Sequence, residues 1–250
     1  MTDIILELED VVAGYGEMTI LNQTSFAIRR GAITTVIGPN GSGKSTVFKA
    51  VFGLLKLRSG TIRFDGRTIS GLPPRALLER GICYVPQGRN IFPELSVRHN
   101  LELGLVAAGG QVDIEAKVAA AMARFPMLAS RASRQASTLS GGEQKLLEIA
   151  RGLLLEPKLL LIDEPSIGLS PRMVGEIFEL LRELRAQGIT VLMIEQNARS
   201  ALALSDWAVV LELGRALIVD RAEAVLNNPE VGQLFLGGSM TQTTRTEEAR

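Results

Sequence analysis

The residues with the clearest chemical potential form a short run of glycines that ends in a lysine and two hydroxyls. Residues 38–46 read GPNGSGKST and fit the pattern G-x-x-x-x-G-K-[ST]. Glycines let backbone N–H groups approach phosphate oxygens, the lysine adds a positive charge, and the first hydroxyl can bind Mg²⁺. The β-branched run Ile33–Ile37 before the loop and the helical pattern Val47–Leu55 after it supply the strand and helix that such a loop requires. The alternative is a flexible Gly/Ser turn. The predicted nucleotide-binding residues are Gly38, Asn40, Gly41, Ser42, Gly43, Lys44, Ser45 and Thr46, with Ser45 also a predicted metal ligand.

Two consecutive carboxylates follow a fully apolar run later in the chain. Leu159–Ile162 is followed by Asp163, Glu164 and Pro165. Such a run is typical of a buried strand, whose C-terminal end opens into the crevice where ligands bind in open α/β sheets. We expect Asp163 to hold the Mg²⁺ shell and Glu164 to polarise a water molecule for attack on the γ-phosphate. Alone, the pair could equally be a strand that ends at charged turn residues, but the phosphate loop favours the catalytic interpretation.

A third motif combines a helix start with two glycines. Residues 139–144 read LSGGEQ and stand before an amphipathic run. Ser140 and Glu143 have the spacing of a capping box, so an ordinary helix start explains them. Gly141 and Gly142 add exposed N–H groups at a helix N-terminus, which makes this segment a candidate for a second anion-binding site.

The elements that must position these residues alternate between short apolar strands and amphipathic helices. The clearest helix is predicted over Pro171–Ala186, where Ser170 suits the N-cap and Gly188 the end. Several strand patterns are apolar throughout, as in a parallel sheet that is covered on both faces. The predicted fold class is therefore α/β with a mainly parallel sheet. The predicted strands are Ile33–Ile37, Ile82–Val85, Leu159–Ile162, Thr190–Ile194 and Ala208–Leu211.

Two parts of the chain depart from this alternation. Ile4–Leu8 and Ser25–Ile28 have the pattern of an antiparallel pair at one edge. Ser96–Ala136 contains Ala-rich helical segments and no convincing strand. We interpret it as the main part of a helical insertion that spans about residues 90–155 of the α/β core.

Composition and charge exclude several classes of protein. The 27 basic and 27 acidic residues balance, which gives no reason to expect nucleic-acid binding. The single cysteine, Cys83, excludes an internal disulfide framework. The longest charge-free run, Val231–Thr244, has 14 residues, fewer than the ~20 of a spanning helix, and Met1–Glu9 lacks the basic region of a secretory signal. Residues 1–238 are predicted to form one domain, and 239–250 a flexible polar tail.

Together the motifs resemble the nucleotide-binding subunit of ATP-binding cassette (ABC) transporters, a P-loop ATPase fold, over about Ile4–Gly238. The resemblance rests on the phosphate loop, the 139–144 signature, the acidic strand and Gln87, which follows Tyr84-Val85-Pro86. It implies a head-to-tail dimer in which the phosphate loop of one subunit and the signature of the other enclose ATP. It further implies that Gln87 reaches the Mg²⁺ and senses the membrane partner, and that Tyr15 stacks on adenine. The alternative for Tyr15 is a core aromatic at a turn.

Three further segments resemble the second ATPase of branched-chain amino-acid importers and their amide or urea relatives. They are residues 88–97, GRNIFPELSV; residues 164–171, EPSIGLSP; and residues 194–198, IEQNA. The resemblance implies permease subunits that span the membrane, a homodimer or a heterodimer with a second ATPase subunit, and, indirectly, a periplasmic or extracellular solute-binding protein. It also implies a location at the cytoplasmic face of the cell membrane and no nucleic-acid partner.

Two positions depart from the general family pattern. Gln196 stands where most ABC ATPases have a histidine, and Ser170 where an aspartate is usual. The Gln196 amide can donate to phosphate but cannot titrate, so we expect Gln196 to keep the contact while Glu164 activates the water. These departures leave open a regulatory ABC subunit that binds ATP and hydrolyses it poorly. A second alternative is a soluble ABC ATPase without a transport role.

The segment Arg89–Leu103 is the candidate site for docking on a membrane subunit. Ile91, Phe92 and Leu95 offer apolar anchors there, although they could equally fill the interface between the core and the helical insertion. The single histidine, His99, is expected to be a solvated helix residue after the N-cap Ser96, because a histidine without Cys or His partners makes no metal site.

Overall fold

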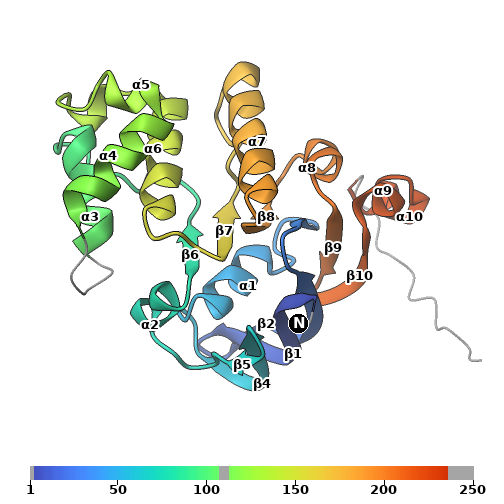
Figure 1. Ribbon diagram of the computed structural model, residues 1–250. Helices are drawn as coiled ribbons and strands as arrows, with labels where there is room; N and C mark the ends of the chain where they lie inside the picture. The colour runs from blue at the N-terminus through green and yellow to red at the C-terminus, as the bar shows by residue number, and fades with distance from the viewer. Residues whose placement is uncertain (1–2, 107–112, 236–250) are drawn as a thin grey trace, which may run out of the picture.

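A computed structural model describes residues 3–106 and 113–235, and these residues form two sheets with helices around them (Figure 1). The larger sheet has six strands in the order β10-β9-β3-β8-β7-β6, all parallel except β10. Its strands are β3 (Ile33–Ile37), β6 (Ile82–Val85), β7 (Leu159–Asp163), β8 (Thr190–Ile194), β9 (Trp207–Glu212) and β10 (Arg215–Arg221).

The five predicted strands are confirmed, three of them to the residue. Every residue of β3, β7 and β8 is buried, as expected for parallel strands with both faces covered. Because β7, β8 and β3 are parallel neighbours, their C-terminal ends meet at one edge of the sheet. That edge receives the phosphate loop and both carboxylates of the acidic strand.

A second sheet has four antiparallel strands in the order β2-β1-β4-β5. The predicted antiparallel pair is confirmed, since Leu6 lies opposite Ile28 and Leu8 opposite Phe26. The two strands are longer than predicted and belong to this separate sheet, which the shorter β4 and β5 complete. Its strands are β1 (Ile4–Tyr15), β2 (Met18–Arg29), β4 (Leu57–Phe64) and β5 (Arg67–Thr68).

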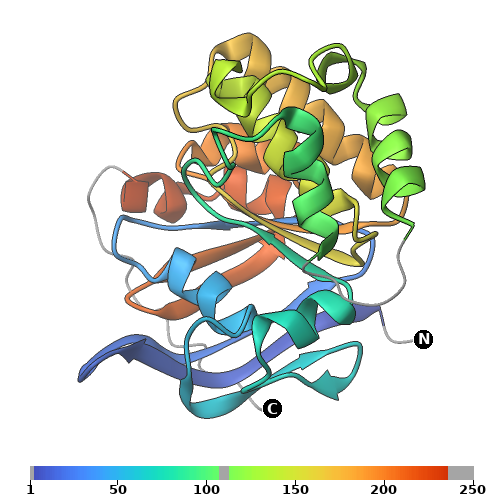
Figure 2. The same ribbon diagram turned by 90° about the vertical axis from the view of Figure 1, so that its left-hand side faces the viewer.

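The helices divide between the two faces of the larger sheet. They are α1 (Lys44–Val51), α2 (Pro74–Glu79), α3 (Val97–Val106), α4 (Ile114–Arg124), α5 (Pro126–Ala129), the 3₁₀ turn η1 (Ala136–Thr138), α6 (Gly141–Leu153), α7 (Pro171–Ala186), α8 (Ala198–Leu204), α9 (Ala222–Leu226) and α10 (Pro229–Phe235). Successive β7 residues point to opposite faces: Leu159 and Leu161 pack in a core with α1 and the antiparallel sheet, and Leu160 and Ile162 in a core with α3–α7. Figure 2 shows α1 and the helices α3–α6 on opposite sides of this sheet.

Among its described residues, the predicted helical insertion contains helices joined by turns and no named strand. Residues 96–106 and 113–136 hold α3, α4, α5 and the start of η1, with an isolated bridge between Ser96 and Gln135. Residues 107–112 and the predicted tail 239–250 lie outside the described residues, and the domain boundaries stay a prediction. Among the helices that are described, none is long and apolar enough to cross a membrane.

Helix starts follow their capping residues. Helix α7 spans the predicted Pro171–Ala186, and the Ser170 hydroxyl accepts a hydrogen bond from the Met173 N–H. The Ser96 hydroxyl accepts a hydrogen bond from the backbone N–H of His99. His99 is exposed, so the prediction of a solvated histidine is confirmed.

Candidate functional site

The phosphate loop connects the central strand β3 to the N-terminus of α1, in the predicted context. Gly43 occupies the N-cap with φ of 103° and supplies no side-chain acceptor, so the N–H groups of the first turn are left for a ligand. Gly41 has φ of 81°, a conformation that favours glycine. A Cβ on Gly38 would lie 2.0 Å from the carbonyl oxygen of Leu211 in β9, so the loop is held against the sheet.

The Lys44 side chain binds the backbone of the phosphate loop in this structure. Its Nζ donates hydrogen bonds to the carbonyl oxygens of Gly38 at 2.8 Å and Pro39 at 3.0 Å. Burial lowers the pKa of Lys44, while the carboxylates of Glu164 and Asp163 oppose that shift. A phosphate that entered the loop would offer the ammonium an anionic acceptor in place of two neutral carbonyls.

Asp163 is the last residue of β7 and only 2% exposed. The Tyr84 hydroxyl donates to its Oδ2 at 3.3 Å, while Oδ1 has no hydrogen-bond partner among the described residues. Burial raises the pKa of Asp163, and the Ser45 hydroxyl and Lys44 oppose the rise. A buried carboxylate oxygen without a partner, beside a hydroxyl on the phosphate loop, suits the hard oxygen coordination of Mg²⁺.

Glu164 and Gln87 meet although 77 residues separate them in sequence. The Gln87 Nε2 donates to Glu164 Oε2 at 2.8 Å, because β6, which precedes Gln87, pairs with β7. Glu164 has φ of 47°, and its N–H donates to the Ile194 carbonyl oxygen at the end of β8. Burial raises the pKa of Glu164, as do the charges of Asp163 and Glu195, while Lys44 opposes them. The structure therefore brings two of the predicted site residues into direct contact.

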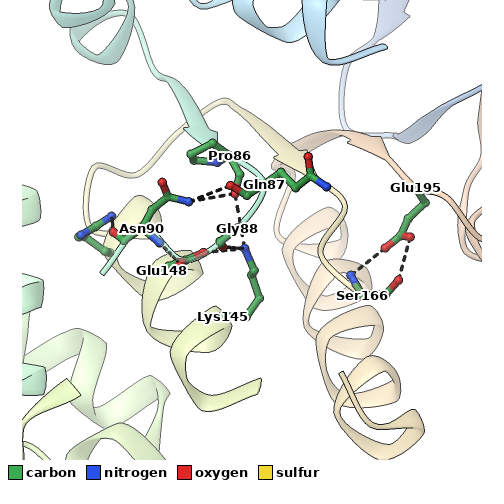
Figure 3. A network of polar contacts seen from close by, with 9 residues as sticks. Pro86, Gln87, Gly88, Asn90, Lys145, Glu148, Ser166 and Glu195 are labelled. Atoms are coloured by element: carbon green, nitrogen blue, oxygen red, sulfur yellow. Dashed lines mark hydrogen bonds and ion pairs between the residues drawn. The ribbon is translucent and has the colours of Figure 1, made fainter. Parts of the chain in front are cut away.

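Glu195 is a site residue that sequence reasoning did not single out. It is 2% exposed and accepts hydrogen bonds from the Ser166 N–H at 2.9 Å and the Ser166 hydroxyl at 2.8 Å (Figure 3). Its Oε2 also accepts from the N–H of Gln196 at 3.2 Å, and the Gln196 side chain is exposed. Glu195 thus ties the loop after Glu164 to the turn that carries Gln196. A carboxylate directly after an apolar strand, the pattern that singled out Asp163, was the available signal.

Tyr15 lies at the end of β1, in the hairpin that leads to β2. Its side chain is 46% exposed, and the Lys49 Nζ on α1 lies 5.5 Å from the centre of its ring. The alternative that Tyr15 is a core aromatic is therefore wrong. The ring faces solvent beside the helix that follows the phosphate loop, where it is open to a stacking partner.

The signature residues form the predicted capping box at the N-terminus of α6. The Ser140 hydroxyl accepts from the Glu143 N–H, and Glu143 Oε2 accepts from the Ser140 N–H at 2.8 Å. Gly141 is exposed, and a Cβ on Gly142 would lie 2.6 Å from Met173 Cγ of α7. Helix α6 packs on the face of the larger sheet opposite α1. Each of the two helix ends is therefore a separate candidate anion site.

A mostly apolar groove of about 370 Å³ runs between the larger sheet and the helical insertion. Phe92 lines it with 50% of its surface exposed, whereas Ile91 packs on the core beneath the helices and Leu95 is half-buried. Of the three proposed apolar anchors, Ile91 and Leu95 are therefore half-buried and Phe92 faces the groove. The groove is also lined by Tyr84, Pro86, Leu103, Gly104, Glu148 and Arg151.

Comparison with known proteins agrees with this geometry. The family model for ABC transporters matches residues 21–167. The chain is 41% identical to the high-affinity branched-chain amino acid transport ATP-binding protein BraG of Pseudomonas aeruginosa, over 94% of this chain and 100% of BraG. It is 38% identical to the probable branched-chain amino acid transport ATP-binding protein LivF of Archaeoglobus fulgidus, over 90% of this chain and 95% of LivF.

A solved structure supports the same assignment. The ADP conformation of MJ1267, an ATP-binding cassette of an ABC transporter, superposes with a TM-score of 0.85 at 32% identity, over 95% of this chain and 100% of MJ1267. The predicted P-loop ATPase fold with an antiparallel sheet and a helical insertion is thereby confirmed. The chain belongs to the ABC transporter family, as an ATP-binding cassette subunit with the ATPase fold.

Proposed function

We propose that this chain is the ATP-hydrolysing subunit of an importer for branched-chain amino acids or related small amides. The observation that carries the proposal is the contact of Gln87 with Glu164 at the end of the acidic strand, next to the phosphate loop. The names of the relatives BraG and LivF supply the solute class and favour an importer over a soluble ABC ATPase.

In this proposal the phosphate loop holds the triphosphate and Tyr15 stacks on the adenine. Lys44 exchanges its two carbonyl acceptors for phosphate oxygens when ATP binds. Ser45, Gln87 and Asp163 would hold Mg²⁺, and the buried Asp163 Oδ1 without a partner among the described residues supports that role. When bound, Mg²⁺ would neutralise the phosphate charge.

Glu164 acts as the general base in the proposed reaction. Burial and the charge of Asp163 raise its pKa, which makes it a better proton acceptor than an ordinary surface carboxylate. Gln196 donates from its exposed amide to the γ-phosphate, and Glu195 holds the backbone of Gln196 in place. The Gln87 amide orients Glu164 before the nucleotide arrives.

The proposed working unit is a dimer. The phosphate loop and the signature residues Ser140, Gly141, Gly142 and Glu143 lie on helices that cover opposite faces of one sheet. A second subunit placed head to tail would bring its own signature to this phosphate loop, and two ATP molecules would be enclosed. The partner is either a second copy of this chain or a different ATPase subunit.

The proposed membrane partner docks in the groove beside Phe92, at the cytoplasmic face of the membrane. An exposed aromatic at the mouth of an apolar groove is a typical anchor for a partner helix. The solute itself would pass through the permease subunits and arrive from a solute-binding protein outside the cell membrane. Phe92→Ala combined with Leu95→Ala should release the permease, whereas Leu226→Ala, an exposed leucine on α9, should retain it.

The experiment that tests the proposal is steady-state Mg-ATP hydrolysis by the purified chain over a range of protein concentrations. Glu164→Gln serves as the control for contaminating ATPases. A rate that rises faster than linearly with protein, and that the variant abolishes, supports a self-pairing ATPase. If addition of a second ATPase subunit and the permease also yields no rate above that of the variant, the chain is a regulatory subunit and the proposal fails.

A further inference from the structure

Helix α6 contains a buried ion pair that the proposed reaction does not use. Lys145 and Glu148 are 6% and 3% exposed, and Lys145 Nζ lies 2.6 Å from Glu148 Oε2. Taking two charges out of water is costly, and a protein in which well-packed apolar side chains of similar volume replace a buried ion pair is often as stable as the original. A stability argument alone therefore does not explain why this helix carries charges at these positions.

The two charges also hold the loop that carries Gln87 (Figure 3). The Lys145 ammonium has three donors, and besides Glu148 it reaches the carbonyl oxygens of Gly88 at 3.1 Å and Pro86 at 3.5 Å. Glu148 Oε1 accepts a hydrogen bond from the N–H of Asn90. The pair thus contacts the backbone on both sides of Gln87.

Gln87 itself lies between β6 and α3, outside regular secondary structure. Its side chain is exposed, and its one hydrogen bond to another residue's side chain in the described part of the protein is to Glu164. A long exposed side chain keeps one geometry only when its backbone is held. The flanking carbonyls of Pro86 and Gly88 are held by charge-assisted hydrogen bonds, which are about twice as strong as neutral ones.

We propose that Lys145 and Glu148 form a positioning clamp that fixes the Gln87 loop to α6 and so keeps the Gln87 amide on Glu164. Since α6 begins at the signature residues, the clamp makes the Gln87 loop move together with the signature. The role in turnover rests on the proposed function, but the role in holding the loop does not. Arg151, whose guanidinium donates to the Asn90 carbonyl oxygen, is the competing tether.

The test replaces both charges at once with Lys145→Met and Glu148→Leu. This double variant keeps the net charge and replaces each charged side chain with an apolar one of similar size, so α6 should fold without an unpaired buried charge. The matched control is the exposed pair Glu179 and Arg182 on α7, which has the same i,i+3 spacing and is changed to Glu179→Leu and Arg182→Met. Thermal unfolding tests whether both variants are folded.

Hydrogen–deuterium exchange without nucleotide measures the loop directly. The Asn90 amide should exchange at least about tenfold faster in the clamp variant, the lower end of the effect of losing one hydrogen bond to a charged group, while α6 stays protected. Hydrolysis should show kcat reduced about tenfold and KM for ATP nearly unchanged, since the phosphate loop and Tyr15 are intact. The control variant should match wild type in both measurements.

Unchanged exchange at residues 87–92 would overturn the proposal that Lys145 and Glu148 hold the loop, and would indicate that Arg151 holds it instead. Faster exchange with unchanged kcat would overturn the clamp's role in turnover. Faster exchange throughout α6 and the larger sheet would show that Lys145 and Glu148 only stabilise the fold, and would overturn their role as a positioning clamp. If the wild-type chain itself lacks hydrolysis with its partners present, the proposed function fails, while the exchange measurement still decides whether the clamp holds the loop.

Discussion

Replacement of Gln196 by alanine isolates the contribution of the side chain that we propose contacts the γ-phosphate, at a position where most ABC ATPases have a histidine. The side chain is exposed, and the hydrogen bond that holds this turn is made by the backbone N–H of Gln196 to Glu195. Alanine keeps that backbone contact and removes only the amide. The folding cost should therefore stay within about 0.5 kcal/mol, as for other exposed substitutions.

The effect on turnover should be much larger. A hydrogen bond to a charged group contributes about 1.5–3 kcal/mol, so loss of the amide should lower kcat about 10- to 150-fold. Steady-state Mg-ATP hydrolysis measures this, with thermal unfolding on the same samples. Gln187→Ala is the matched control, since it makes the same chemical change at an exposed position at the far end of α7 and should leave kcat unchanged.

Equal rates for wild type and Gln196→Ala would refute this reasoning and leave Glu164 to activate the water without help from Gln196. Gln196→His should retain activity, because an imidazole N–H can donate to the same phosphate. Its rate should also gain a pH dependence near 6.5, where histidine titrates and glutamine does not. An inactive histidine variant would contradict the donor role.

Three further predictions concern protonation, packing and nucleotide affinity. Burial and the charge of Asp163 raise the pKa of Glu164 above 4.5. As the pH is lowered, kcat/KM should therefore begin to fall at a higher pH than for an ordinary glutamate. A fall in kcat/KM only at pH 4.5 or below would contradict this prediction. A Cβ on Gly152 would lie 2.8 Å from Cys83 Sγ, so Gly152→Ala should destabilise by about 1–3 kcal/mol, and Cys83→Ala should rescue it in thermal unfolding. Additive effects would show that the two side chains do not compete for space. Tyr15→Ala should weaken ATP binding by about 1–3 kcal/mol in calorimetry and Tyr15→Trp should not, while equal affinities would exclude stacking.

The parts of the fold that were predictable are those in which short-range chemistry decides the structure. The run Ile33–Ile37 consists entirely of β-branched residues, which favour a strand, and its boundaries were predicted to the residue. Ser140 and Ser170 cap helices through contacts three residues away, so their spacing alone indicates where α6 and α7 begin. The phosphate loop carries its strand and helix on either side for the same reason.

The unpredicted strands lack such local signals. β4 spans Leu57–Phe64, and its first four residues include Arg58, Ser59 and Gly60, which do not favour a strand on their own. It forms because Leu6 and Leu8 of β1 pair with its second half. β10 pairs with the end of β9 across a turn at Leu213, and its partly polar residues are stabilised by that pairing.

The same distinction separates the predicted site residues from those found only in the structure. Lys145 and Glu148 have the spacing of an ordinary solvent-exposed helix pair, and only their burial against residues 86–90, more than 50 positions earlier, reveals their contacts with the Gln87 loop. Motifs identify groups that must touch a ligand, because the ligand dictates their types. The residue types that hold those motifs in place are constrained only by packing in the fold, so several pairs of residue types could serve equally well. The proposed clamp on α6 is a pair of this kind, because its role follows from contacts that only the folded chain creates.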